Sequence, residues 1–160
     1  MDAVRMLVHD HEVLTSQVEH VAALVNGLLH KSFEPATIRE ELMQQVELLK
    51  DQLLEHFGFE EEAAFPFLMK AMPNDASRLQ AMSVDHDRIA RHLVEVAELL
   101  RLTGKQTLQL QAGPIAATFE QFLNYYRSHV HEEFEILSAM QCNLTDEQRR
   151  ELSAIAERLV

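Results

Sequence analysis

Apolar residues recur at alternating intervals of three and four along almost the whole chain, which is the spacing that places side chains on one face of an α-helix. No comparable stretch alternates apolar and polar residues at every second position, as a half-buried β-strand would. Glycine and proline number only four each among 160 residues, so few turns interrupt the pattern. The sequence therefore predicts an all-α protein built from long helices.

Four amphipathic stretches of roughly 25 residues carry this spacing, and short connections join them. Their apolar positions fall within residues 4–28, 38–67, 79–100 and 115–140. Long amphipathic helices with short connections favour an antiparallel up-and-down four-helix bundle in which the apolar faces meet.

The ends of these helices are predicted from residues that start or stop helical turns. Pro66 has no backbone N–H, so it should kink or end the second helix about one turn after Glu60. Asn74 is expected to cap the third helix and Gly104 to end it. Pro114 is expected to open the fourth helix.

The C-terminal part of the chain predicts a short fifth helix at about residues 145–159. Thr145 and Gln148 have the spacing of a capping box at its start. A chain of 160 residues has the length of one domain. We therefore expect a single domain over residues 1–160, with a core bundle at about residues 1–141.

Charge and composition exclude several classes of partner. The net charge of −12 has the wrong sign for binding nucleic acid or anionic lipid. No apolar run is long enough to cross a membrane. Cys142 is the single cysteine, and the N-terminus lacks the features of a signal peptide, so a cytoplasmic protein is expected.

Six polar residues interrupt the predicted apolar faces, and they need an explanation. They are His11, His56, Glu60, His86, His129 and Glu133. Each glutamate follows a histidine by four residues, so the two side chains of a pair point the same way from one helix. The spacing of the histidines is nearly the same in both halves of the chain, which predicts a pseudo-twofold bundle.

Two metal ions would account for these six residues. A buried ionised carboxylate costs several kcal/mol unless it is paired or bound to metal, and the apolar faces carry no lysine or arginine. Imidazole and carboxylate groups suit iron, manganese or zinc. If each ion takes two histidines and both glutamates bridge, a shared oxo or hydroxo group leaves an octahedral ion one open position for O2, NO or peroxide. The alternative is a polar core held by hydrogen bonds alone.

Other polar residues are weaker candidates. The HxxxE spacing also occurs at His30 and His131, but the first lies near a helix end and the second lies off the apolar face. Tyr126, one turn before His129, is a candidate to bond a metal ligand or a bound oxygen species. Asp85, like the other acidic residues that flank the lone histidines, is a candidate to accept a ring N–H or relay protons. The absence of HExxH, glycine-rich phosphate loops and GxSxG excludes hydrolases of those kinds.

The six residues, together with the segment HFGFEEEAAFP, resemble the ligand pattern of the hemerythrin-like family of HHE cation-binding domains. The resemblance covers nearly the whole chain. It implies a four-helix bundle that holds a carboxylate-bridged di-iron centre for O2, NO or peroxide chemistry. Oxygen-carrying members have a further histidine and an aspartate where this chain has Met82 or Ala90, and Phe134. The chain is more similar to bacterial members with two HxxxE pairs, including a group linked to repair of iron–sulfur centres.

Three functional hypotheses follow. The first is a di-iron protein that binds, senses or detoxifies O2, NO or peroxide, and enzymatic consumption of peroxide or NO is a variant of it. The second is repair of damaged iron–sulfur centres or delivery of iron to them. The third is a bundle with a purely structural metal such as zinc.

Overall fold

The computed structural model describes residues 2–31, 34–104 and 107–159, and every regular element among them is helical. The long helices are α1 (Ala3–Leu29), α2 (Pro35–Phe59), α4 (Ala76–Leu102) and α5 (Leu108–Asn143). The shorter elements are the π-helical turn η1 (Glu60–Ala64), α3 (Phe65–Ala71), the 3₁₀ turn η2 (Pro73–Asp75) and α6 (Asp146–Leu159). The predicted all-α fold is confirmed.

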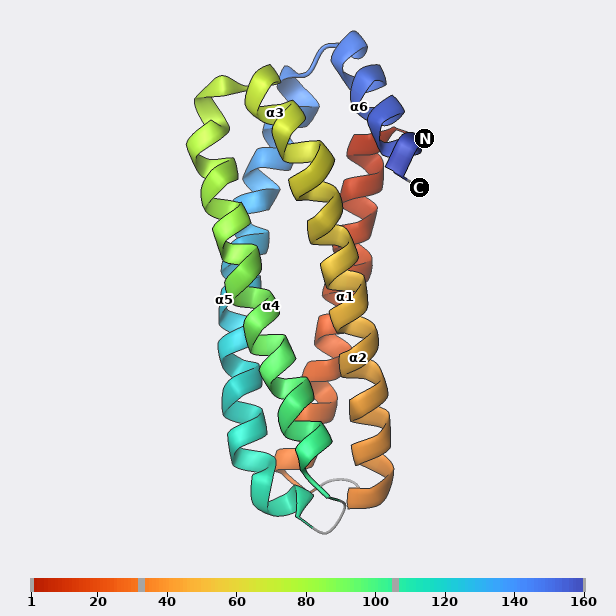
Figure 1. The fold of residues 1–160 in the computed structure, drawn as a ribbon, viewed down its shortest axis with the longest axis vertical. Helices are drawn as coiled ribbons and strands as arrows, with labels where there is room; N and C mark the ends of the chain where they lie inside the picture. The colour runs from red at the N-terminus through yellow and green to blue at the C-terminus, as the bar shows by residue number, and fades with distance from the viewer. Residues whose placement is uncertain (1, 32–33, 105–106, 160) are drawn as a thin grey trace.

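The four long helices form an antiparallel bundle (Figure 1). Helix α1 packs against α2 and α5, and α4 packs against the same two helices, so α1 and α4 lie on opposite corners. Helix α6 folds back at the end of the bundle where the chain begins, and it contacts α1 and η1. The predicted up-and-down topology with an extra C-terminal helix is therefore observed.

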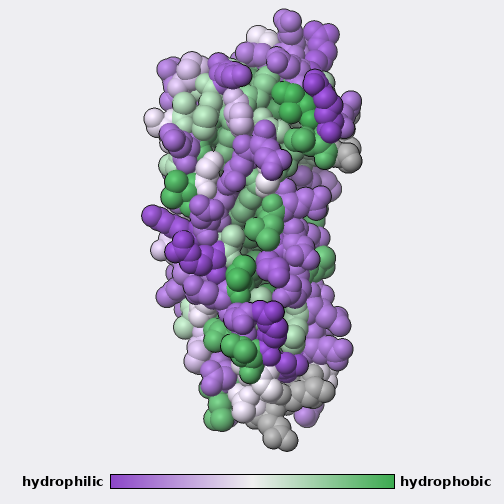
Figure 2. All heavy atoms as spheres, viewed as in Figure 1, coloured by the Kyte–Doolittle hydropathy of each residue, from purple (hydrophilic) through white to green (hydrophobic). Residues whose placement is uncertain are grey.

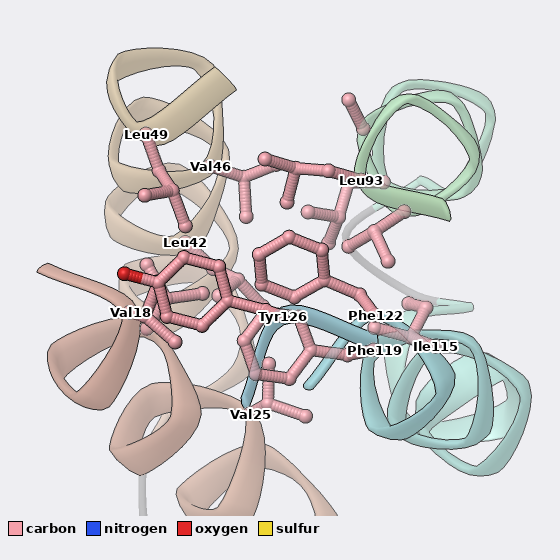
Figure 3. Packing of buried hydrophobic residues seen from close by; sticks show 14 of the residues in the cluster. Val18, Val25, Leu42, Val46, Leu49, Leu93, Ile115, Phe119, Phe122 and Tyr126 are labelled. Carbon is pink, nitrogen blue, oxygen red and sulfur yellow. The ribbon is translucent and has the colours of Figure 1, made fainter. Parts of the chain in front are cut away.

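The apolar core is divided into two clusters. The larger cluster runs from Leu14 in α1 to Phe57 in α2 and includes Tyr126 at its limit in α5. Its phenylalanines Phe119 and Phe122 project from α5 between the other helices (Figure 3). The smaller cluster fills the other end of the bundle, where α3 and α6 cover it. Five of the six predicted polar residues lie in sequence between the two clusters, and His56 directly precedes Phe57, the last residue of the larger cluster in α2. The six residues therefore form a polar layer between the clusters.

The π-helical turn η1 changes the register of the segment after α2. The backbone N–H of Phe65 bonds to the carbonyl of Glu60, five residues earlier, so this turn holds one more residue than an α-helical turn. Positions that face the core therefore come one residue later than the α-helical spacing predicts. Leu68 is buried, whereas Phe67, which the sequence placed on the apolar face, is only half-buried. The regular α-helix is interrupted near Pro66, as predicted, but the interruption is the turn η1 before the proline, and Pro66 itself lies in the first turn of α3.

Helix α5 begins earlier than expected. Pro114 lies inside the helix rather than at its start, which corrects the prediction, and Leu108 and Ala112 add two buried positions. Proline leaves the carbonyl four residues before it without a partner, here that of Leu110, whose side chain is 78% exposed. This carbonyl is on a side of the helix that water reaches. Gly113 has no Cβ to collide with the proline ring, so the helix runs through.

The remaining boundaries are close to those predicted. The N-cap of α4 is Asp75 rather than Asn74, because Asn74 belongs to the 3₁₀ turn η2. Gly104 follows the C-cap of α4 at Thr103, as its predicted role requires. The capping box of α6 is confirmed: the Thr145 N–H donates to Gln148 Oε1 at 2.9 Å, and the Gln148 N–H donates to Thr145 Oγ1 at 3.2 Å.

Polar side chains cover most of the face shown in Figure 2, and apolar side chains are visible between them. No helix within residues 2–31, 34–104 and 107–159 is both long and apolar enough to cross a membrane.

Candidate metal centre

The polar layer brings together all six residues predicted from the sequence. Five of their side chains are at most 4% exposed, and that of His11 is 11% exposed. Their ligand atoms form two overlapping groups that could each hold a metal ion. The first contains His11, His56, Glu60 and Glu133, and the second contains Glu60, His86 and His129.

In the first group, side chains of α1, α2 and α5 converge. The Nε2 atoms of His11 and His56 lie 3.2 Å apart. His56 Nε2 lies 2.9 Å from Glu60 Oε1, and His11 Nε2 lies 2.6 Å from Glu133 Oε2. Two ring nitrogens and two carboxylate oxygens therefore face one small volume.

In the second group, side chains of α4 and α5 meet the end of α2. The Nε2 atoms of His86 and His129 lie 3.2 Å apart, the same distance as in the first group. His86 Nε2 lies 3.1 Å from Glu60 Oε2. Glu60 thus directs one oxygen to each histidine pair, which is the position of a bridging carboxylate. Glu133 Oε2 lies 3.2 Å from His129 Nε2, so this oxygen also stands between the groups.

Hydrogen bonds at the far side of two rings show which nitrogen faces the cluster. His11 Nδ1 lies 2.6 Å from the Leu7 carbonyl oxygen, and His86 Nδ1 lies 2.8 Å from Glu61 Oε1. Both oxygens act as acceptors, so each Nδ1 carries the hydrogen, and in a neutral ring Nε2 presents a lone pair. Lone pairs on these Nε2 atoms would then point at carboxylate oxygens, which is repulsive unless cations or protons lie between them.

Orphaned polar atoms support the same conclusion. Both carboxylate oxygens of Glu60 and Oε2 of Glu133 are buried without a hydrogen-bond partner of acceptable geometry among the described residues. A buried polar atom without a partner is costly. A nitrogen and oxygen donor set with unsatisfied atoms facing one point suits iron, manganese or zinc, so the residues present fit a bound metal.

The sequence matches the hemerythrin HHE cation-binding domain family over residues 2–140. The chain belongs to this family. No curated protein and no solved structure gives a significant match. The matched segment of the HHE domain includes all four long helices up to Met140, and helix α6 lies beyond it.

Glu60 and Glu133, the two glutamates of the polar layer, have pKa values shifted in opposite directions. Burial raises the pKa of Glu60 well above its usual value, and the nearby Glu133 carboxylate adds to this effect. Burial acts in the same direction on Glu133, but the close approach of Glu60, His11 and His129 holds its pKa well below the usual value. The two carboxyl groups lie close enough for the charge of one to oppose ionisation of the other.

The pKa values of His86 and His11 in the polar layer are also shifted in opposite directions. Burial lowers the pKa of His86 to about 3, and the neighbouring His129 contributes, so this ring is neutral at physiological pH. Burial opposes protonation of His11 as well, but its contact with Glu133 outweighs that effect and raises the pKa. A metal ion replaces such protons when it binds, because ligand nitrogens must be deprotonated.

Sequence reasoning missed Glu61, whose carboxylate accepts the N–H of His86. The prediction placed Asp85 in this role, but the ion pair of Asp85 is with Arg88, at 4.0 Å. The only signal in the sequence is the acidic run of Glu60, Glu61 and Glu62 next to a ligand pair. That run does not show which residue reaches another helix, because η1 changes the local spacing.

Tyr126 is buried in the larger apolar cluster, next to the polar layer. Its hydroxyl lies 3.0 Å from Thr15 Oγ1, and either group could donate. Thr15 follows His11 by one helical turn, and Tyr126 precedes His129 by nearly one turn, so the pair spans α1 and α5 beside the cluster. Burial raises the pKa of Tyr126 to about 12, so its hydroxyl keeps its proton. Contact with a bound small molecule remains a prediction.

The histidines outside the polar layer take no part in the two groups. His9, His20, His30 and His131 are exposed. His92 stacks on Tyr125 with ring centroids 5.2 Å apart. His131 therefore lies off the apolar face, as predicted, whereas His129 is buried in the polar layer.

Two surface grooves reach the cluster on either side of α1. The groove between α1 and α2 has a volume of about 450 Å³ and is lined by His56, Gly58 and Asp10 among others. The groove between α1 and α5 has a volume of about 560 Å³ and reaches His11. Its walls include Val8, Val130, Phe134 and Leu137. Both grooves thus open beside residues of the polar layer, His56 in one and His11 in the other.

Proposed function

We propose that this HHE domain holds two iron ions between its four long helices and uses them to bind, sense or detoxify O2, NO or peroxide. One observation carries the proposal. Glu60 belongs to both groups of ligand atoms, and each of its unpartnered oxygens faces a different pair of histidines. This arrangement supports two ions that share a carboxylate.

The nitrogen and oxygen donors of the six residues suit iron, manganese and zinc. Iron would supply reversible changes of oxidation state and an open coordination position for a small molecule. In this proposal the six residues hold the ions, the two apolar clusters exclude water on either side of them, and the two grooves beside α1 give access. The groove between α1 and α5 brings apolar side chains such as Phe134 and Leu137 close to His11, which suits the approach of an uncharged molecule such as O2 or NO.

The first experiment measures metal per chain by elemental mass spectrometry on untagged protein from iron-replete cells. We expect close to two irons per chain for the wild type. His129→Ala should lose iron, whereas His131→Ala should keep it, since both residues belong to HxxxE pairs on α5 but only His129 faces the cluster. If His129→Ala fails to fold, as judged by circular dichroism, His129→Gln replaces it.

The outcomes separate the competing functions. Negligible metal after anaerobic iron loading would contradict the proposal and return the six residues to a hydrogen-bonded polar core. Stoichiometric zinc with no iron would favour a structural metal. With iron bound, stable optical changes on adding NO or O2 favour binding or sensing, whereas steady consumption of peroxide or NO favours detoxification.

A further inference from the structure

His86 differs from the other three histidines of the polar layer, because a carboxylate contacts each of its two ring nitrogens. Consecutive glutamates of η1 contact opposite edges of its ring: Glu60 Oε2 lies 3.1 Å from Nε2, and Glu61 Oε1 lies 2.8 Å from Nδ1. Phe57 stacks on the ring with centroids 3.8 Å apart and an interplanar angle of 9°. Phe65 lies nearly parallel to the same ring at 5.6 Å. One short segment around η1 therefore fixes both edges of a ring that belongs to another helix.

The other three histidines lack a carboxylate at Nδ1. His11 Nδ1 donates to the Leu7 carbonyl of its own helix. His56 Nδ1 is buried and lies 3.9 Å from Asp10 Oδ2, which is too far for a hydrogen bond. His129 Nδ1 is buried without a hydrogen-bond partner in the described part of the chain. The two halves of the chain therefore repeat the histidines but not the hydrogen-bond partners of their Nδ1 atoms.

The two groups of ligand atoms are also unequal in composition. The group with His11 contains two glutamates and two histidines, whereas the group with His86 contains one glutamate and two histidines. Glu133 Oε2 lies 2.6 Å from His11 Nε2 and 3.2 Å from His129 Nε2, so this carboxylate is closer to the first group. The second group is the one whose histidine, His86, bonds to a carboxylate outside both groups. An anionic acceptor at Nδ1–H makes the opposite nitrogen a stronger donor to a metal and fixes the orientation of the ring.

We propose that Glu61 is a positioning residue that makes the two metal positions unequal, by strengthening His86 as a ligand for the ion held with His129. The inference rests on the proposed function, because it requires ions at both positions. The negative charge of Glu61 favours binding of the ion held by His86 and His129, and it favours the more oxidised state of this ion. Glu61 acts through His86 and needs no contact with the metal.

The test compares Glu61→Gln with Glu62→Gln. Both variants remove one negative charge from η1, but only Glu61 contacts His86, and Glu62 is an exposed residue that lines the groove between α1 and α2. Anaerobic titration with ferrous iron should show two binding steps for the wild type. Glu61→Gln should weaken one step by about 10–100-fold and leave the other in place, because loss of such an outer hydrogen bond has this typical cost. Glu62→Gln should match the wild type.

Redox titration and NMR add readouts that a general loss of stability would not produce. The reduction potential of one iron should rise in Glu61→Gln and stay unchanged in Glu62→Gln. In the metal-free protein, ¹⁵N spectra should show the hydrogen of His86 on Nδ1, and this signal should shift in Glu61→Gln alone.

The possible results distinguish the two proposals. A wild type that binds two irons, with Glu61→Gln identical to it in binding and potential, would overturn the role of Glu61 and leave the proposed function standing. Equal changes in Glu61→Gln and Glu62→Gln would mean that only the charge of η1 matters, and this result would also overturn the proposed role of Glu61. A wild type that binds no iron would overturn the proposed function, and the role of Glu61 with it, even if the NMR signal shows the hydrogen bond to His86.

Discussion

At the scale of single residues, Gly58 is placed unusually for a glycine. It lies inside α2 between His56 and Glu60, no glycine of the described residues has a positive φ, and an added Cβ would meet no atom within 4 Å. Neither backbone geometry nor close packing therefore requires glycine there. Its remaining distinction is that it lines the groove that reaches His56.

The first prediction concerns Gly58→Ala. The free energy of unfolding should rise by about 1 kcal/mol, because alanine has the higher helix propensity and its methyl group enters open space. Chemical denaturation of the metal-free protein measures this change, and iron content should not fall. Gly113→Ala is the control: its Cβ also meets nothing, but it precedes Pro114 and would crowd the proline ring, so its gain should be smaller. Lower stability or iron content in Gly58→Ala would show that the glycine serves the site.

At the scale of elements, α6 closes one end of the bundle. Leu152 and Ala156 belong to the smaller apolar cluster, and Ser153 Oγ accepts the Ala3 N–H at 3.0 Å. Arg149 lies 3.4 Å from Asp2, whose side chain caps α1. The last helix therefore ties down the first turn of α1, a short distance along that helix from His11.

The second prediction tests this contact. Leu152→Ala should lower the free energy of unfolding by about 2–5 kcal/mol, because it removes a fully buried side chain and leaves a cavity. Leu159→Ala changes a side chain that is 52% exposed on the same helix and should have little effect. Thermal unfolding of both variants gives the comparison. Similar midpoints would mean that α6 contributes little to the stability of the bundle.

The third prediction concerns the start of the same helix. Thr145→Ala removes one of the two reciprocal hydrogen bonds of the capping box and should cost about 0.5–2 kcal/mol. Denaturant titration measures the loss. If the box matters only for α6, iron binding should stay unchanged while stability falls. An unchanged denaturation midpoint would contradict a stabilising role for the capping box.

At the scale of the whole molecule, stability depends on the charges buried in the polar layer. The pKa of His86 is about 3 in the folded chain and near 6.5 when the chain is unfolded. Between these values the unfolded state binds more protons, so this group favours folding above pH 6.5 and loses that contribution as pH falls. The slope can reach about 1.4 kcal/mol per pH unit.

The fourth prediction follows from this sign. Metal-free wild type should lose stability as pH falls from 6.5 to 4.5, and metal-free His86→Gln should lose it with a shallower slope. Urea denaturation at several pH values measures both slopes, and the difference between them isolates His86 from the other titrating groups. Parallel slopes for the two proteins would contradict the lowered pKa of His86.

Metal binding should raise the stability of the wild type at pH 7. This stabilisation should disappear in acid, because protons compete with the metal for the ligands.

The sequence determined the helical class, the apolar faces and the six polar residues, because helical periodicity is a local property of the chain. It also indicated the capping box of α6. It placed the start of α5 wrongly at Pro114, since whether a helix runs through a proline depends on which side of the helix meets water. Such local rules cannot count residues across an irregular turn, so Leu68 rather than Phe67 is buried after η1.

Only the tertiary structure decided how the six residues combine. It paired His11 with His56 and His86 with His129, and it placed Glu60 between the pairs. The contact of Glu61 with His86 joins residues on different elements, and no spacing along the chain encodes the distance between two helices. The repeat in the sequence is nearly symmetric, but packing made the two positions unequal, because each ring nitrogen bonds to whatever acceptor the neighbouring helix brings within reach.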